Sequence, residues 1–148
     1  MKTSPKFSIL LLVSLILVYA TGSCQNDADN KTSDIKLAAK KIIENAGTCA
    51  LITLDKEGAP RARTMDPFPM EEGFIIWFGT NPNSRKVDQI KNDPRVTLYY
   101  LDNDASGYVV ISGEATLVND QKQKDKYWKD SWESFYPDKS ESYLLIKV

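Results

Sequence analysis

Apolar residues in the first part of the predicted domain follow a helical period and then form a strand-like run. The helical stripe consists of Ile35, Ala38, Ala39, Ile42 and Ile43. Ser33 or Asp34 can cap the start of this helix. The helix is predicted to run to Ala46, and Gly47 to end it. Residues 48–54, TCALITL, are short and mostly apolar, which predicts a strand.

Five further apolar or alternating runs predict strands. They are residues 61–65 (RARTM), 74–79 (FIIWFG), 95–101 (RVTLYYL), 108–118 (YVVISGEATLV) and 143–148 (YLLIKV). Turn residues separate the runs, including Gly58 before the first of them. Gly113 lies inside the longest run and suggests a bulge or a close backbone approach there.

Two more segments have helical periodicity. A short helix is expected to start at Ser84 and to stop before Pro94, with Val87 and Ile90 spaced i, i+3. Residues 119–136 are also expected to be helical. One face of that helix would carry Trp128, Trp132, Phe135 and Tyr136. Five or six antiparallel strands with helices at the edges predict a mainly β (α+β) domain, built as a small closed or split barrel.

Residues 1–23 are expected to be a secretory signal peptide. Lys2 and Lys6 precede an apolar run, residues 7–20, that is too short for a comfortable membrane span. Small residues then lead to Cys24. They resemble a bacterial lipoprotein signal, in which this cysteine is acylated and becomes the first residue of the mature chain. Plain secretion and an uncleaved anchor are the alternatives.

The lipoprotein interpretation predicts an exported protein, lipid-anchored in the bacterial cell envelope at the periplasmic face or outer membrane. Thr21 departs from the usual pattern, which has leucine there. Residues 24–33 are polar and are expected to form a tether to a domain at residues 34–148. If Cys24 is acylated, Cys49 has no intramolecular disulfide partner, and it is expected to be a small buried residue.

The amino-acid composition narrows the classes of function that the chain can have. The 148 residues contain 19 basic and 20 acidic side chains and no histidine. Cleavage before Cys24 removes two lysines, which lowers the basic count from 19 to 17 and gives a net charge of −3. We expect no nucleic-acid partner, because there is no basic excess. The lack of histidine removes the commonest general base and metal ligand, so we expect no metal site.

Two basic residues stand at the start of the short helix. Arg85 and Lys86 occupy its first turn, the positive end of the helix dipole, where each cation costs about 0.3–1 kcal/mol. A phosphate bound at this end would reverse that penalty, because free N–H groups and cations both favour an anion. The two residues are therefore candidates for a phosphate site.

Upstream residues can join such a site. Arg61, Arg63 and Met65 share one strand face, because side chains alternate along a strand. If this strand pairs with the next one in a hairpin, Thr80 and Ser84 would lie near Arg63. We therefore predict a phosphate site. The alternative is that Ser84 caps the helix and the cations extend into solvent.

These motifs also resemble a known family. The runs RARTM, WFGTNPNSRKVDQIKNDPRVTLYYLD and YVVISGEATLV are similar to those of pyridoxamine 5'-phosphate oxidase-like, FMN-binding split barrels. YWKDSWESFYPD followed by YLLIKV resembles the general stress protein branch. The resemblance covers the chain from about Asp34 onward. It implies a homodimer of six-stranded antiparallel split β-barrels with flanking helices, and FMN in the groove between subunits.

The resemblance also implies roles for individual residues. The FMN phosphate would be held by Arg63, Ser84, Arg85 and Lys86. The flavin would be lined by Thr64, Met65, Phe78, Gly79 and Thr80. Arg61 is a further candidate, because the register of the two arginines against the family motif is ambiguous by two residues. Trp128 and Trp132 would either close the site or belong to the core.

A departure from the family pattern limits the expected activity. Pyridoxamine phosphate oxidases carry a C-terminal arginine–histidine segment that binds substrate, and this chain has no histidine. We expect an FMN-dependent oxidoreductase of another specificity, with no catalytic residue named. One alternative is a non-catalytic lipoprotein that holds flavin or another phosphorylated ligand as a stress-related buffer or sensor. Another is a surface-anchored barrel whose groove serves only dimerisation.

Overall fold

The computed structural model describes residues 29–148. The expected signal peptide, Cys24 and the first part of the expected tether lie outside the described residues. The chain divides into two compact units, Met1–Ala38 and Ala39–Val148. Within residues 29–148, no helix combines the length and the apolar character needed to cross a membrane.

The first described helix spans residues 29–46. It begins before Asp34, so the predicted cap at Ser33 or Asp34 is wrong, and residues 29–33 of the expected tether are helical. The helix ends as predicted. Gly47 follows with φ of 65°, a left-handed conformation that glycine adopts without strain. Ile43, from the predicted apolar stripe, is buried in the core.

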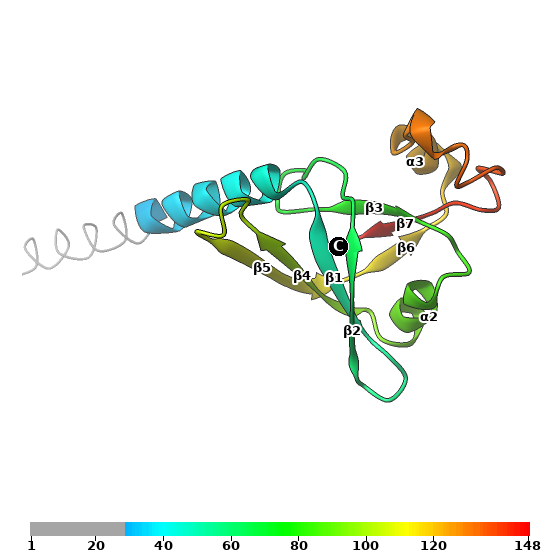
Figure 1. The fold of residues 1–148 in the computed structure, drawn as a ribbon, viewed down its shortest axis with the longest axis horizontal. Helices are drawn as coiled ribbons and strands as arrows, with labels where there is room; N and C mark the ends of the chain where they lie inside the picture. The colour runs from blue at the N-terminus through cyan, green and yellow to red at the C-terminus, as the bar shows by residue number, and fades with distance from the viewer. Residues whose placement is uncertain (1–28) are drawn as a thin grey trace, which may run out of the picture. The chain divides into compact units, whose positions relative to one another are not determined.

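Within residues 29–148, seven strands form two antiparallel sheets (Figure 1). The first sheet has the order β2-β1-β4-β5, with β1 Cys49–Leu54, β2 Pro60–Met65, β4 Arg95–Leu101 and β5 Tyr108–Glu114. The second has the order β3-β7-β6, with β3 Trp77–Thr80, β6 Thr116–Val118 and β7 Leu144–Lys147. The expected antiparallel split-barrel class is confirmed, with one more strand than predicted because residues 108–118 divide into β5 and β6.

The two sheets are joined at two corners. At one, the chain passes from β5 to β6 through Ala115, which is buried and donates its amide to the carbonyl of Pro94 at 2.7 Å. At the other, Pro67 forms a bridge with Phe78 just beyond the end of β2. The β2–β3 hairpin that the sequence analysis took as a condition does not form, because the two strands belong to different sheets.

Gly113 has no special backbone role. It pairs with Val96 in an uninterrupted β4–β5 register, and a Cβ there would lie 3.5 Å from Val148, an ordinary contact. The predicted bulge or close approach at Gly113 is therefore wrong. The strand breaks at Ala115 instead, where the chain turns from one sheet to the other.

The second sheet is buried on both faces. Phe78 and Ile146 point into the core that it shares with the first sheet. Trp77 and Leu145 point the other way, into an aromatic cluster under residues 119–143. Because both faces are covered, these strands are nearly continuous apolar runs rather than alternating ones.

The segment that covers this sheet is mostly irregular. The helix predicted for residues 119–136 is wrong in extent, because α3 spans only Gln121–Lys126 and a single 3-10 turn spans Asp130–Trp132. Phe135 is 72% exposed and does not share the buried face. Trp128, Trp132 and Tyr136 do pack together, but on Tyr143 and the sheet rather than along a helix.

Lys124 holds this covering segment together. Its side chain is 1% exposed and donates to Oδ1 of Asn119 at 3.0 Å and to the carbonyl of Ser140 at 2.6 Å. These bonds join the two ends of the segment and give the buried ammonium group two oxygen acceptors. The hydroxyl of Tyr143 donates to the carbonyl of Tyr127, which closes the same loop.

Gly79→Ala should destabilise the protein by about 1–3 kcal/mol, because overpacking a filled site forces its neighbours to move. A Cβ at this position would lie 2.6 Å from Cη2 of Trp132 and 2.7 Å from Cε2 of Tyr143. Urea denaturation measures the change. Gly113→Ala is the matched control and should change the free energy of unfolding by less than about 0.5 kcal/mol. Equal losses in the two variants would contradict the packing role of Gly79.

Candidate functional site

The short helix after β3 places two basic residues at its N-terminus. This helix, α2, spans Arg85–Asn92, with Ser84 as the N-cap and no hydrogen bond from the Ser84 side chain to the helix. Val87 and Ile90 are buried, as their spacing predicts. The predicted start of the helix is confirmed. Burial of this apolar face fixes the helix against the barrel and leaves Arg85 exposed and Lys86 half-buried.

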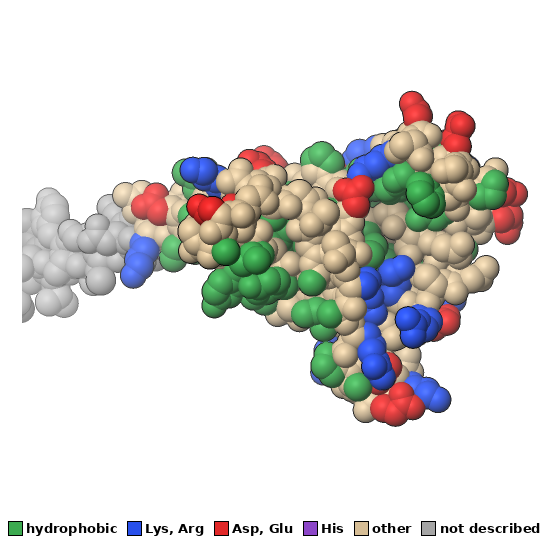
Figure 2. Space-filling view, viewed as in Figure 1, with side chains coloured by type: hydrophobic (Ala, Val, Ile, Leu, Met, Phe, Trp, Pro, Cys, Tyr) green, Lys and Arg blue, Asp and Glu red, His purple; other side chains and the backbone are tan. Residues whose placement is uncertain are grey.

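A polar cleft of about 730 Å³ lies between β2 and the N-terminal part of α2. It is lined by Asp55, Pro60, Arg61, Ala62, Arg63, Ser84, Arg85, Lys86 and Gln89. Figure 2 shows basic side chains gathered over this part of the surface. The predicted convergence of the β2 arginines with the start of α2 therefore occurs. It occurs because α2 packs against β1, the strand that pairs with β2.

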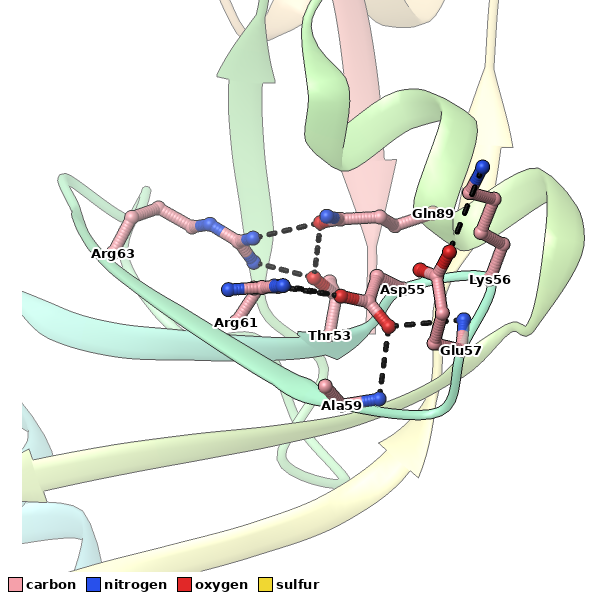
Figure 3. Close-up of polar contacts among 8 residues, drawn as sticks. All are labelled: Thr53, Asp55, Lys56, Glu57, Ala59, Arg61, Arg63 and Gln89. Atoms are coloured by element: carbon pink, nitrogen blue, oxygen red, sulfur yellow. Dashed lines mark hydrogen bonds and ion pairs between the residues drawn. The ribbon is translucent and has the colours of Figure 1, made fainter.

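The two arginines of β2 lie on the same strand face, as predicted, but have different partners (Figure 3). Arg61 forms an ion pair with Asp55 at 2.7 Å. Arg63 donates instead to three neutral oxygens, the Leu51 carbonyl at 3.1 Å, Thr53 Oγ1 at 2.7 Å and Gln89 Oε1 at 2.8 Å. Arg61 is therefore charge-compensated within the chain, and Arg63 is not.

Lys86 lies at the junction between β3 and α2. Its Nζ donates to Oγ1 of Thr80 at 3.1 Å, and that hydroxyl lies 3.2 Å from Oγ of Ser84. Thr80 is buried, with 2% of its surface exposed. Two hydroxyls and one ammonium group thus meet at the start of the helix, all three of which can bind phosphate oxygens.

The charges of this cleft repel one another. Burial lowers the pKa of Arg63, and the nearby charge of Arg85 lowers it further. Burial likewise lowers the pKa of Lys86, with a second contribution from Arg63. Within residues 29–148, none of the salt bridges involves Arg63, Arg85 or Lys86. Three cations converge without a carboxylate partner, which is the electrostatic character of an anion site.

A second cleft, of about 430 Å³, shares the lining residue Lys86 with the first. It is lined by Thr64, Met65, Asp66, Gly79, Thr80, Asn81, Lys86, Trp132, Phe135 and Tyr136. Four of the residues expected to line a flavin, Thr64, Met65, Gly79 and Thr80, lie here together. Phe78 does not line either cleft, because its side chain is fully buried in the core.

Sequence reasoning missed the residues that surround Arg63. Gln89 follows Arg85 by four positions, so helical spacing alone could have placed it on the same face of α2. Thr53 lies directly opposite Arg61 in the β1–β2 register, and only strand pairing could reveal that. Asp55 is likewise brought to Arg61 by the β1–β2 turn, in which it accepts the amides of Ala59 and Glu57.

Cys49 has the structural character expected from the sequence. It is 4% exposed, and burial raises the pKa of its thiol to about 11, which disfavours the reactive thiolate. Among residues 29–148, no group of three or more potential metal-ligating His, Cys, Asp or Glu side chains comes together.

Comparison with known proteins identifies the family. Residues 35–148 match the family described as pyridoxamine 5'-phosphate oxidase like. The chain belongs to this family. The resemblance stated from the sequence motifs is thereby confirmed. No curated protein matches the chain significantly.

Several solved structures share the fold. General Stress Protein 26 from Bacillus anthracis str. Sterne is 26% identical, with a TM-score of 0.65 over 77% of this chain and 87% of that one. A protein from Clostridium acetobutylicum related to general stress protein 26 is 21% identical, with a TM-score of 0.63 over 75% and 80%. A pyridoxamine 5'-phosphate oxidase-related, FMN-binding protein from Nostoc punctiforme is 17% identical, with a TM-score of 0.60 over 80% and 78%.

Proposed function

We propose that this protein binds FMN and places the phosphate of FMN in the cleft between β2 and α2. The observation that carries the proposal is the convergence of Arg63, Arg85 and Lys86 without a carboxylate partner among residues 29–148. An anion bound between them would relieve their repulsion, and Ser84 and Thr80 offer neutral hydrogen bonds beside it. The FMN-binding relative from Nostoc punctiforme supports flavin as the class of ligand.

The second cleft suits the rest of such a ligand. Lys86 lines both clefts, so a molecule with its phosphate beside Lys86 would place its remaining atoms on the side of Gly79. The aromatic rings of Trp132 and Tyr136 form one wall and would exclude water from a ring system placed there. Asp66 lines the same cleft, so one carboxylate is also present.

We further propose that the bound flavin serves an oxidoreductase reaction. FMN supplies hydride or electron transfer when bound, and the chain contributes anchoring, orientation and exclusion of water. No residue is assigned to proton transfer. Reduction of the bound flavin by a nicotinamide cofactor in a stopped-flow experiment distinguishes a catalyst from a stress-related flavin buffer or sensor, which would hold flavin without turnover.

FMN should bind to the purified protein, and Lys86→Ala and Arg63→Ala should each weaken binding by about 1.5–3 kcal/mol, the usual loss for a charge-assisted hydrogen bond. Fluorescence titration with FMN measures the dissociation constants. Riboflavin, which lacks the phosphate, should bind the wild type and both variants alike. The matched control is Lys91→Ala, an exposed lysine at the other end of α2. Loss of affinity in that control, or none in the two cleft variants, would contradict the phosphate site.

We also propose that the protein is a homodimer, with the outer face of the first sheet at the interface. That face exposes Tyr99, Leu101, Tyr108 and Val110, which are 36–65% accessible on β4 and β5. Figure 2 shows hydrophobic side chains gathered over these strands. A contiguous apolar patch of this kind on a folded protein is typical of an association surface, and a second copy presents the same patch.

Val110→Asp should convert the dimer to a monomer, because two buried carboxylates would face the apolar patch of the opposite subunit. Light scattering coupled to gel filtration measures the molar mass. Thr116→Asp, which adds the same charge at an exposed position of β6 in the other sheet, should leave the dimer intact. A monomeric wild type would contradict the proposed dimer.

Finally, we propose that Cys24, outside the described residues, anchors the protein in the cell envelope through a lipid. Cys24→Ala should then release the protein from the membrane fraction, since lipid chains provide the membrane affinity. Immunoblots of membrane and soluble fractions report the distribution. Continued membrane association of the variant would indicate an uncleaved apolar anchor instead.

A further inference from the structure

The two arginines of β2 differ in whether the chain neutralises them. Both lie on one strand face and both line the polar cleft. A carboxylate beside Arg61 cancels its charge, whereas Arg63 has only uncharged acceptors around it (Figure 3). An arginine keeps its attraction for an external anion only if its own neighbours do not supply one.

The acceptors around Arg63 form a closed set of hydrogen bonds. Arg63 donates through Nη1 to Thr53 Oγ1 at 2.7 Å and through Nη2 to Gln89 Oε1 at 2.8 Å. Thr53 in turn donates its hydroxyl proton to the same Gln89 oxygen at 2.6 Å. Each of the three side chains therefore fixes the orientation of the other two, and the guanidinium is held before any ligand arrives.

This set of bonds links three elements of the fold. Thr53 comes from β1 and is completely buried, Arg63 comes from β2, and Gln89 comes from α2. Because Thr53 is held by the sheet and Gln89 by the helix, the guanidinium is fixed relative to the helix start that carries Arg85 and Lys86. Preorganisation of this kind reduces the entropy lost when a ligand binds.

We propose that Gln89 and Thr53 are positioning residues that orient Arg63 for the phosphate of the ligand and leave the charge of Arg63 uncompensated. Asp55 neutralises Arg61, so Arg61 does not serve as the phosphate-binding arginine. The inference rests on the proposed function and deepens it. It assigns Arg63, rather than Arg61, as the phosphate-binding arginine of β2. It also explains why an amide stands at position 89, since a carboxylate there would make Arg63 resemble Arg61.

The test is a double-mutant cycle on FMN binding, with riboflavin as the ligand that lacks the phosphate. Gln89→Leu should weaken FMN binding about tenfold in the wild-type background, the usual loss for a bond to a charged group. The same substitution should have no further effect in an Arg63→Ala background, because Gln89 acts through Arg63. Riboflavin affinity should stay constant throughout.

Gln89→Glu separates positioning from a merely structural role. The carboxylate can accept the same hydrogen bonds from Arg63 and Thr53, so urea denaturation should show stability close to that of the wild type. FMN binding should nevertheless weaken by at least the factor seen for Gln89→Leu, because Arg63 is then paired. Arg61→Ala should weaken FMN binding less than Arg63→Ala does, because Arg61 is already paired with Asp55.

The outcomes separate this inference from the proposed function. FMN that fails to bind the wild-type protein overturns the proposed function and this inference with it. If FMN binds the wild type, additive losses in the cycle overturn the inference alone. Full FMN affinity in Gln89→Glu, or a larger loss for Arg61→Ala than for Arg63→Ala, would overturn it as well.

Discussion

Mutual repulsion among three cations that have no carboxylate partner within residues 29–148 is the constraint on which the candidate site depends. Arg63, Arg85 and Lys86 line one cleft, and burial makes the charges of Arg63 and Lys86 more costly. A folded chain tolerates such an arrangement only if the rest of the structure holds the groups in place. The convergence of these cations therefore points to a bound anion, because unrestrained cationic side chains would separate into solvent.

The fold supplies that restraint through ordinary packing. Val87 and Ile90 fix α2 against the barrel, and β1 pairs with β2 along its whole length. The hydroxyl of Thr53 and the amide of Gln89 then connect helix and sheet through Arg63. Apolar burial thus provides the stability. A small number of neutral hydrogen bonds fixes the orientation of the Arg63 guanidinium.

The second sheet shows how tertiary contacts can override a local pattern. Trp128, Trp132 and Tyr136 have helical spacing, yet the chain between them forms only one 3-10 turn, and their rings pack on Tyr143 and the sheet. The close approach of Trp132 to Gly79 places this aromatic wall directly beside the cleft. The packing of the aromatic segment therefore also determines the shape of the second cleft.

The sequence by itself determined the elements whose signals are local. These are most of the strands, the start of α2, the end of the helix at Gly47, the shared face of Arg61 and Arg63, and the family through its motifs. Tertiary structure alone decided that β2 and β3 lie in different sheets and that the strand breaks at Ala115. It also decided that Asp55 pairs with Arg61 while Gln89 holds Arg63. The reason is physical, since periodicity reports which way one side chain points, whereas the partner of a charge depends on which distant segments the core brings together.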